Sequence, residues 1–279
     1  MEHTMDDSML QAFEEYLIQE EKSDATIEKY MREVAFLSEF LHHEKIDKKN
    51  LLAYRETLLE RFQVQTVNGK LSAINAYLKF AGLGRFAVKL LKIQRRSFLC
   101  ENKELTDSEY RRLLSAAKQR RDMRLYYLMM TVCSTGIRVS ELKFITVNAL
   151  HIGHAEIRLK GKNRTVILPK KLVEKLWKYA LQNGIKSGPV FQTRSGRPLD
   201  RSNICHAMKQ LCQYARVDVR KVFPHNLRHL FARSFYAIEK NLAHLADILG
   251  HSSIETTRIY IAASMKSHER VIRKMQLIV

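Results

Sequence analysis

The chain has 279 residues, of which 46% are hydrophobic and only four are proline, so a disordered or low-complexity polypeptide is excluded. The length allows one large domain or two modest ones, and no apolar run approaches the ~20 residues that span a bilayer, which predicts a soluble intracellular protein. Residues 1–50 carry a charge of −7 while residues 101–279 carry +19, which indicates a nucleic acid partner, with an anionic membrane surface or mere solubility as alternatives.

Four amphipathic helices are predicted in the first 80 residues. Their apolar side chains recur at helical spacing, and Ser23 or Asp24 is a suitable cap for the second helix. The first two stripes contain Leu10, Phe13 and Leu17, then Ile27, Tyr30, Val34, Leu37 and Leu41; the next two contain Leu51, Tyr54 and Leu58, then Val67, Leu71, Ile74, Tyr77 and Leu78. Gly82 and Gly84 end the pattern, so residues 1–95 are predicted to form a helical domain.

A basic connector follows over residues 86–103, and the linker between the domains is placed at 96–103. The cations of this connector are Lys89, Lys92, Arg95 and Arg96. They would follow the phosphate backbone of a nucleic acid, although an ordinary solvated connector explains them equally well. A helix is predicted to begin near Thr106, because Thr106 and Glu109 have the spacing of a capping box. The second domain is therefore placed at 104–279.

The second domain is predicted to be mainly helical with one β-hairpin. Ala155–Leu159 and Thr165–Leu168 read as strands around a positively charged tip, Lys160 to Arg164. Pro169 ends the hairpin, and helical patterns return over 200–215, 225–238 and 241–249. The cysteines show no zinc-finger spacing, so no metal site is predicted and free thiols are expected.

Five segments of the second domain carry groups suited to phosphate chemistry. Each is weak by itself, because a single arginine, lysine, histidine or tyrosine most often lies on the surface or in a core. In chain order they are TGIRVSEL with Arg138, KGKNR with Lys160, HNLRH with His225 and Arg228, LGHSS with His251, and TTRIY with Tyr260. His225 and Arg228 are one helical turn apart, so both would lie on one face.

Together, the order and spacing of these motifs resemble the phage integrase family of tyrosine recombinases, with the bacterial Xer recombinases and small transposon integrases as similar members. The resemblance implies a mainly α fold with a small β-hairpin, in which a helical SAM-like core-binding domain precedes an α+β catalytic domain. It assigns catalytic roles to Arg138, Lys160, His225, Arg228, His251 and the nucleophile Tyr260. Glu141 and His229 match supporting positions, and Lys162 is close enough to compete with Lys160.

The resemblance implies a site-specific recombinase that forms a 3′-phosphotyrosine and exchanges strands through a Holliday junction, for a mobile element or for Xer-type dimer resolution. Arginines that meet the phosphate charge make a metal unnecessary, and no ATP or other cofactor is expected. The expected partners are double-stranded DNA with specific sites and three further protomers, identical or paralogous. A tail helix at 265–279 would dock on a neighbouring protomer, with packing on its own domain as the alternative. The resemblance also implies a bacterial protein that lies in the cytoplasm and associates with the nucleoid.

Two other functions fit parts of the same pattern. A sequence-specific DNA-binding protein without catalysis would share the positive charge, and a type IB topoisomerase would share the chemistry. The complete set of candidate residues argues against the first, while the small size and the helical first domain favour recombination over DNA relaxation.

Overall fold

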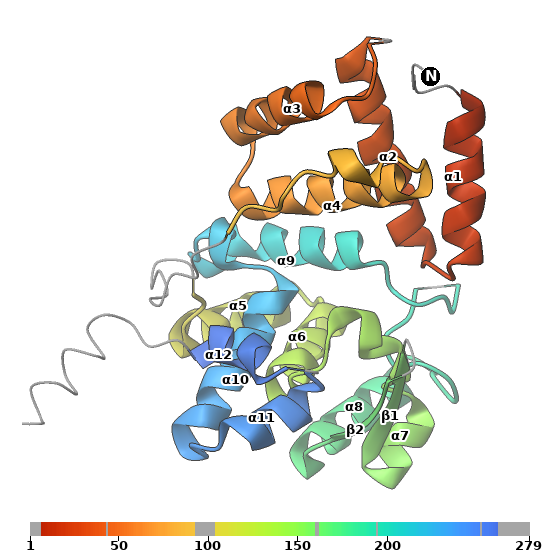
Figure 1. The fold of residues 1–279 in the computed structure, drawn as a ribbon. Helices are drawn as coiled ribbons and strands as arrows, with labels where there is room; N and C mark the ends of the chain where they lie inside the picture. The colour runs from red at the N-terminus through yellow and green to blue at the C-terminus, as the bar shows by residue number, and fades with distance from the viewer. Residues whose placement is uncertain are drawn as a thin grey trace, which may run out of the picture. The chain divides into compact units, whose positions relative to one another are not determined.

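The computed structural model describes residues 7–42, 44–92, 104–159, 162–193, 195–251 and 253–261. The chain divides into two compact units, Met1–Arg95 and Arg96–Val279 (Figure 1). Within the described ranges, no helix combines the length and apolar character needed to cross a membrane. The fold is mainly α with one small antiparallel sheet, as the sequence predicts.

The first unit is a helical bundle around one apolar core. Its helices are α1 (Asp7–Gln19), α2 (Asp24–Leu41), α3 (Lys48–Arg61) and α4 (Val64–Phe80), followed by a 3-10 turn at Gly84–Phe86. Most of the predicted stripe residues are buried in that core, with Leu10, Ile27 and Tyr30 partly buried against it. Ser23 occupies the predicted cap position of α2, and its hydroxyl bonds that of Thr26.

Two asparagines of α4 fix the chain that leaves this bundle. The side-chain amide of Asn75 exchanges two hydrogen bonds with the backbone of Val88, and Asn68 does the same with Leu91. These bonds satisfy the backbone of an extended segment as a neighbouring strand would. Lys89 and Lys92 remain exposed on the fixed segment, whereas Arg95 and Arg96 lie outside the described residues.

The second unit has a larger helical core. Its helices are α5 (Asp107–Gln119), α6 (Met123–Thr135), α7 (Val147–Ile152), α8 (Lys170–Gln182), α9 (Arg201–Ala215), α10 (Pro224–Ile238), α11 (Leu242–Leu249) and α12 (Ile254–Ile261). Helices α6 and α10 pack together, and α11 and α12 contact each other and α10 (Figure 1). This arrangement brings the ends of α6, α11 and α12 close to α10.

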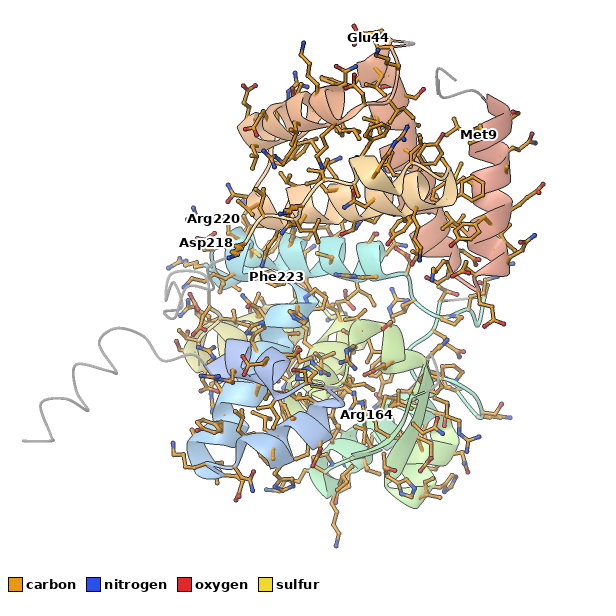
Figure 2. The ribbon with its side chains drawn as sticks, in the orientation of Figure 1. Met9, Glu44, Arg164, Asp218, Arg220 and Phe223 are labelled. Atoms are coloured by element: carbon orange, nitrogen blue, oxygen red, sulfur yellow. The ribbon has the colours of Figure 1, made fainter. Side chains whose placement is uncertain are left out.

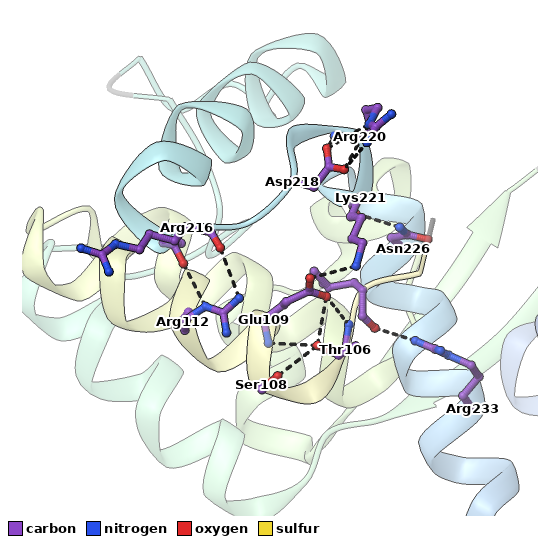
Figure 3. Close-up of polar contacts among 12 residues, drawn as sticks. Thr106, Ser108, Glu109, Arg112, Arg216, Asp218, Arg220, Lys221, Asn226 and Arg233 are labelled. Carbon is purple, nitrogen blue, oxygen red and sulfur yellow. Dashed lines mark hydrogen bonds and ion pairs between the residues drawn. The ribbon is translucent and has the colours of Figure 1, made fainter. Parts of the chain in front are cut away.

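Polar contacts fix the start of this unit. The predicted capping box is present: the hydroxyl of Thr106 accepts from the N–H of Glu109, whose carboxylate accepts from the N–H of Thr106. Glu109 also pairs with Lys221 at 2.9 Å (Figure 3). Arg233 of α10 binds the carboxylate of Glu104. The first helix of the unit is thereby tied to the connection between α9 and α10 and to α10 itself.

The hairpin has different bounds from those predicted. Strand β1 (His154–Leu159) pairs with β2 (Lys162–Ile167) in antiparallel register, with Ile157 opposite Arg164. The prediction of a charged tip over residues 160–164 is therefore wrong for residues 162–164, because β2 begins at Lys162. Arg164 belongs to a strand, and its side chain is only 12% exposed rather than solvated. The charge pattern suggested a tip because the local sequence does not reveal that Arg164 has partners in distant segments of the chain.

Candidate active site

Arg138 stands where α6 gives way to a 3-10 helix, Val139–Phe144. Helix α6 ends at Gly136, whose φ of +66° is in the left-handed region. A Cβ there would lie 2.5 Å from the ring of Phe231 and 2.9 Å from Leu249, so glycine is required on both counts. The Arg138 side chain is 38% exposed, so its guanidinium can reach a ligand.

Glu141 holds two guanidinium groups from a buried position. Its carboxylate accepts from the backbone N–H and the Nη1 of Arg138, at 2.8 and 2.9 Å, and from Nη2 of Arg164 at 2.6 Å. Burial acts to raise the pKa of Glu141, but the Arg138 N–H and the two cations outweigh it, so the pKa is lowered. Glu141 is thus a permanent anion that orients Arg138.

Arg228 is the most deeply placed cation of the site. It lies on α10 with 1% of the residue exposed. Its Nη1 donates to the carbonyl of Gly136 at 2.5 Å, and its Nη2 donates to the carbonyl of Leu249 at 2.6 Å. Carbonyls from the ends of α6 and α11 therefore fix the guanidinium plane, which fits the preference for cations at helix C-termini.

The end of α11 gathers three arginines from three elements. Its successive carbonyls at positions 248, 249 and 250 accept from Arg164, Arg228 and Arg138 at 2.6, 2.6 and 3.3 Å. The last carbonyls of a helix lack helical partners and carry partial negative charge. Three like charges that would repel one another are thereby held together.

His251 follows directly and has a defined tautomer. Nη2 of Arg228 lies 2.8 Å from its Nε2, and because a guanidinium only donates, Nε2 must accept. The proton then lies on Nδ1, which donates to the hydroxyl of the buried Thr257 at 2.8 Å. For His251 to donate to a phosphate through Nε2, Arg228 would have to release that nitrogen.

His225 and His229 lie one turn apart on α10, with ring centroids 5.0 Å apart. Burial, then the charges of Arg228 and Arg138, lower the pKa of His225; because this residue is exposed at the rim, the charges are the firmer cause. Burial, then His225 and Arg233, lower the pKa of His229 to about 4. The site therefore keeps its imidazoles neutral.

A pocket of about 260 Å³ opens at this cluster. It is lined by Arg138, Arg201, His225 and Arg228, with Ile137, Val139, Ser140 and Pro224 completing its wall. No carboxylate is among these described lining residues. Three arginines and a histidine that face one small volume form a site for a tetrahedral anion such as a phosphodiester.

The lowered histidine pKa values predict how the stability of the protein depends on pH. Burial, then Arg228, lowers the pKa of His251 to about 4, and that of His229 is also about 4, against 6.5 for an unfolded histidine. Between pH 6.5 and 4 the unfolded chain binds protons that the folded chain does not. The free energy of unfolding therefore decreases as the pH is lowered from 6.5 to 4.

Urea unfolding at pH 7.0, 6.0 and 5.0 checks this expectation. His229→Gln should lose less stability on acidification than the wild type, while His206→Gln, which removes an exposed histidine of α9, should match the wild type. Equal slopes for all three proteins would show that His229 ionises alike in both states.

The structure brings together four of the six predicted catalytic side chains: Arg138, His225, Arg228 and His251. Two of the three predicted supporting residues, Glu141 and His229, contact them. Lys160 and the tail at 265–279 lie outside the described residues, as do the side chains of Lys162 and Tyr260. The main chain of Tyr260 belongs to α12, three residues after Thr257. Lys89 and Lys92 belong to the first unit, and nothing tests their role in binding DNA.

Sequence reasoning missed three residues of this site. Arg164 was placed in a solvated tip, although it is a buried partner of Glu141. Thr257 was part of a quoted motif, but its bond to His251 was not foreseen. Arg201 lines the pocket from the first turn of α9, where only a helix was predicted. Arg164 and Thr257 stand in the quoted motifs that contain Lys160 and Tyr260, whereas no motif pointed to Arg201.

Family models match both units of the chain. The model of the phage integrase family matches residues 103–267, which include the whole pocket. The chain belongs to the phage integrase family. The N-terminal SAM-like domain of phage integrases matches residues 10–82, so this phage integrase has the two-domain composition that the sequence suggested.

Individual relatives cover nearly the whole of this phage integrase. The tyrosine recombinase XerA of Pyrococcus furiosus is 26% identical, covering 99% of this chain and 97% of that protein. A crystal structure of XerA recombinase aligns at 25% identity with a TM-score of 0.54, covering 98% of this chain and 99% of that one. A lambda integrase in a tetramer on a Holliday junction shares the fold, with 17% identity, a TM-score of 0.73, and coverage of 91% of this chain and 76% of that one.

Proposed function

We propose that this phage integrase is a site-specific DNA recombinase that cleaves and rejoins DNA through Tyr260. The observation that carries this function is the convergence of Arg138, Arg228, His225 and His251 on one site in the unit that matches the family model. Cleavage of a phosphodiester develops negative charge on its non-bridging oxygens, and fixed cationic donors stabilise that charge. The two guanidiniums clamp the oxygens, while His225 donates to them or accepts a proton.

The nucleophile is delivered by α12. The bond between His251 and Thr257 ties this helix to the phosphate pocket, and Tyr260 is one helical turn beyond Thr257. A free tyrosine has a pKa near 10, so its phenol is protonated at neutral pH and needs the cations of the site for activation. Attack on phosphorus forms a 3′-phosphotyrosine and releases a 5′-hydroxyl. Lys160, or Lys162 beside it, gives the proton to that leaving oxygen.

The covalent bond to Tyr260 conserves the energy of the phosphodiester, so religation to a partner strand needs no ATP. Exchange of strands between two sites requires four active protomers, and the lambda integrase tetramer bound to a Holliday junction supports this assembly. In it, the tail at 265–279 docks on a neighbouring protomer, and Lys89, Lys92, Arg95 and Arg96 contact the DNA backbone. Lys89 and Lys92 are exposed on a fixed segment, which suits them to that contact. The protein works in the cytoplasm, on the bacterial nucleoid, to integrate and excise an element or to resolve chromosome dimers.

Capture of covalent adducts on genomic DNA tests this function. The purified protein is incubated with fragmented DNA of its own organism without metal or ATP, and denatured protein–DNA complexes are collected and sequenced. A recombinase yields protein-linked 3′ ends at one or a few sites, and a plasmid carrying two such sites recombines.

Two outcomes would support the rival functions instead. Adducts spread over all sequences, together with relaxation of any supercoiled plasmid by a monomer, would indicate a type IB topoisomerase. Tight binding to one sequence without an adduct, even on a nicked substrate that traps cleavage, would indicate a DNA-binding protein without catalysis.

A further inference from the structure

Arg164 occupies an unusual place for a hairpin arginine. It lies on β2, two residues after the strand begins, yet its side chain leaves the sheet and enters the second unit's interior (Figure 2). There its Nη2 donates to Glu141 at 2.6 Å and its Nη1 to the carbonyl of Ile248 at 2.6 Å. One guanidinium thus joins the hairpin to two other segments of the site.

Both partners of Arg164 also act on residues that face the phosphate. Glu141 receives two further bonds from Arg138, so the carboxylate lies between the two cations. The carbonyl of Ile248 precedes those of Leu249 and Gly250, which hold Arg228 and Arg138. Arg164 itself is absent from the lining of the pocket, so its influence passes through its partners.

The chain makes room for this side chain at Gly250. A Cβ at that position would lie 2.7 Å from Nε of Arg164, and the φ of +63° also favours glycine. Gly250 immediately precedes His251, so the path of Arg164 and the turn that presents His251 are fitted to each other.

We propose that Arg164 is a positioning residue for strand cleavage, which sets Arg138 through Glu141 and couples the hairpin to the phosphate clamp. The proposal rests on the recombinase function above and adds a residue that does not contact the DNA. Because a small displacement of a catalytic group costs up to about 100-fold in rate, loss of Arg164 should slow cleavage about 10- to 100-fold.

Single-turnover cleavage of a nicked suicide substrate tests this step. Arg164→Met should cleave slowly while binding the site with wild-type affinity, and Arg164→Lys should recover only part of the rate because one ammonium does not span both acceptors. Arg158→Met, at an exposed position of β1, is the matched control and should cleave normally. If Arg164→Met cleaves as fast as Arg158→Met, the proposal is wrong.

A double-mutant cycle shows whether Arg164 acts through Arg138. If it does, the rate loss caused by Arg164→Met should be much smaller in the Arg138→Ala background than in the wild type, because the positioned group is already absent. Multiplication of the two rate losses would overturn the proposed route and indicate an independent or purely structural effect.

A second cycle uses melting temperature and does not depend on cleavage. Arg164→Met and Glu141→Gln should lower Tm by less together than the sum of their separate effects, because each breaks the same contact. Additive shifts in Tm would contradict a direct contact between Arg164 and Glu141. If the wild type forms no adduct while this coupling is found, the recombinase function fails and the contact stands.

Discussion

Tyr260→Phe is expected to abolish the covalent protein–DNA adduct, a loss of at least about 10³-fold, because phenylalanine keeps the ring and removes the attacking oxygen. The variant should still bind the recombination site, since the cations that meet the phosphate are unchanged. The adduct is measured on a nicked suicide substrate after denaturing electrophoresis, and DNA affinity is measured by fluorescence anisotropy.

Tyr214→Phe provides the matched control, because Tyr214 is 57% exposed on α9 and its ring stacks on Arg120 without needing the hydroxyl. It should form the adduct at the wild-type rate. An adduct that persists in Tyr260→Phe would show that another residue attacks phosphorus, and peptide mapping of the DNA-linked fragment would identify it.

The second large effect is expected from the two arginines. Removal of one preorganised donor to a developing anion costs about 10² to 10³-fold in rate, so Arg138→Ala and Arg228→Ala should each lose cleavage by at least that factor. DNA affinity should fall far less, since the chain carries 48 lysines and arginines and a net charge of +19. Single-turnover cleavage and anisotropy on the same substrate separate the two quantities.

The two arginine variants should differ in stability. Arg228 is almost fully buried and donates to the carbonyls of Gly136 and Leu249, so alanine leaves buried acceptors unsatisfied, at about 1–3 kcal/mol each. Arg138 is partly exposed, and Glu141 keeps Arg164 when it is lost. Arg228→Ala should therefore melt at a lower temperature than Arg138→Ala. Parallel losses of affinity and cleavage in a folded Arg138→Ala would contradict a catalytic role.

Local sequence patterns predicted the structure correctly where the physical cause of that structure is itself local. Helical periodicity predicted the helices of the first unit because one face of each must be buried, and the capping box at Thr106 and Glu109 needs only three residues of spacing. Gly136 and Gly250 both have positive φ, the backbone conformation that glycine favours. The motifs that named Arg138, His225, Arg228 and His251 also belong to this class.

The hairpin shows where local reading failed. A run of three cations and one asparagine around a glycine is typical of an exposed tip, yet Arg164 is held inside by Glu141 and by the end of α11. Those partners are 23 and 84 residues away in sequence. Burial of a cation depends on partners that only the folded chain supplies.

The sequence alone predicted the family, the helical first unit and the mainly helical second unit, and it pointed to the groups proposed to meet a phosphate. Only the tertiary structure decided how those groups are held: the carbonyls at the end of α11 gather three guanidiniums, Glu141 anchors two of them, and Arg228 sets the tautomer of His251. The physical reason is that residue type and spacing specify which chemistry is available, whereas hydrogen bonds between distant segments specify the direction in which each group points.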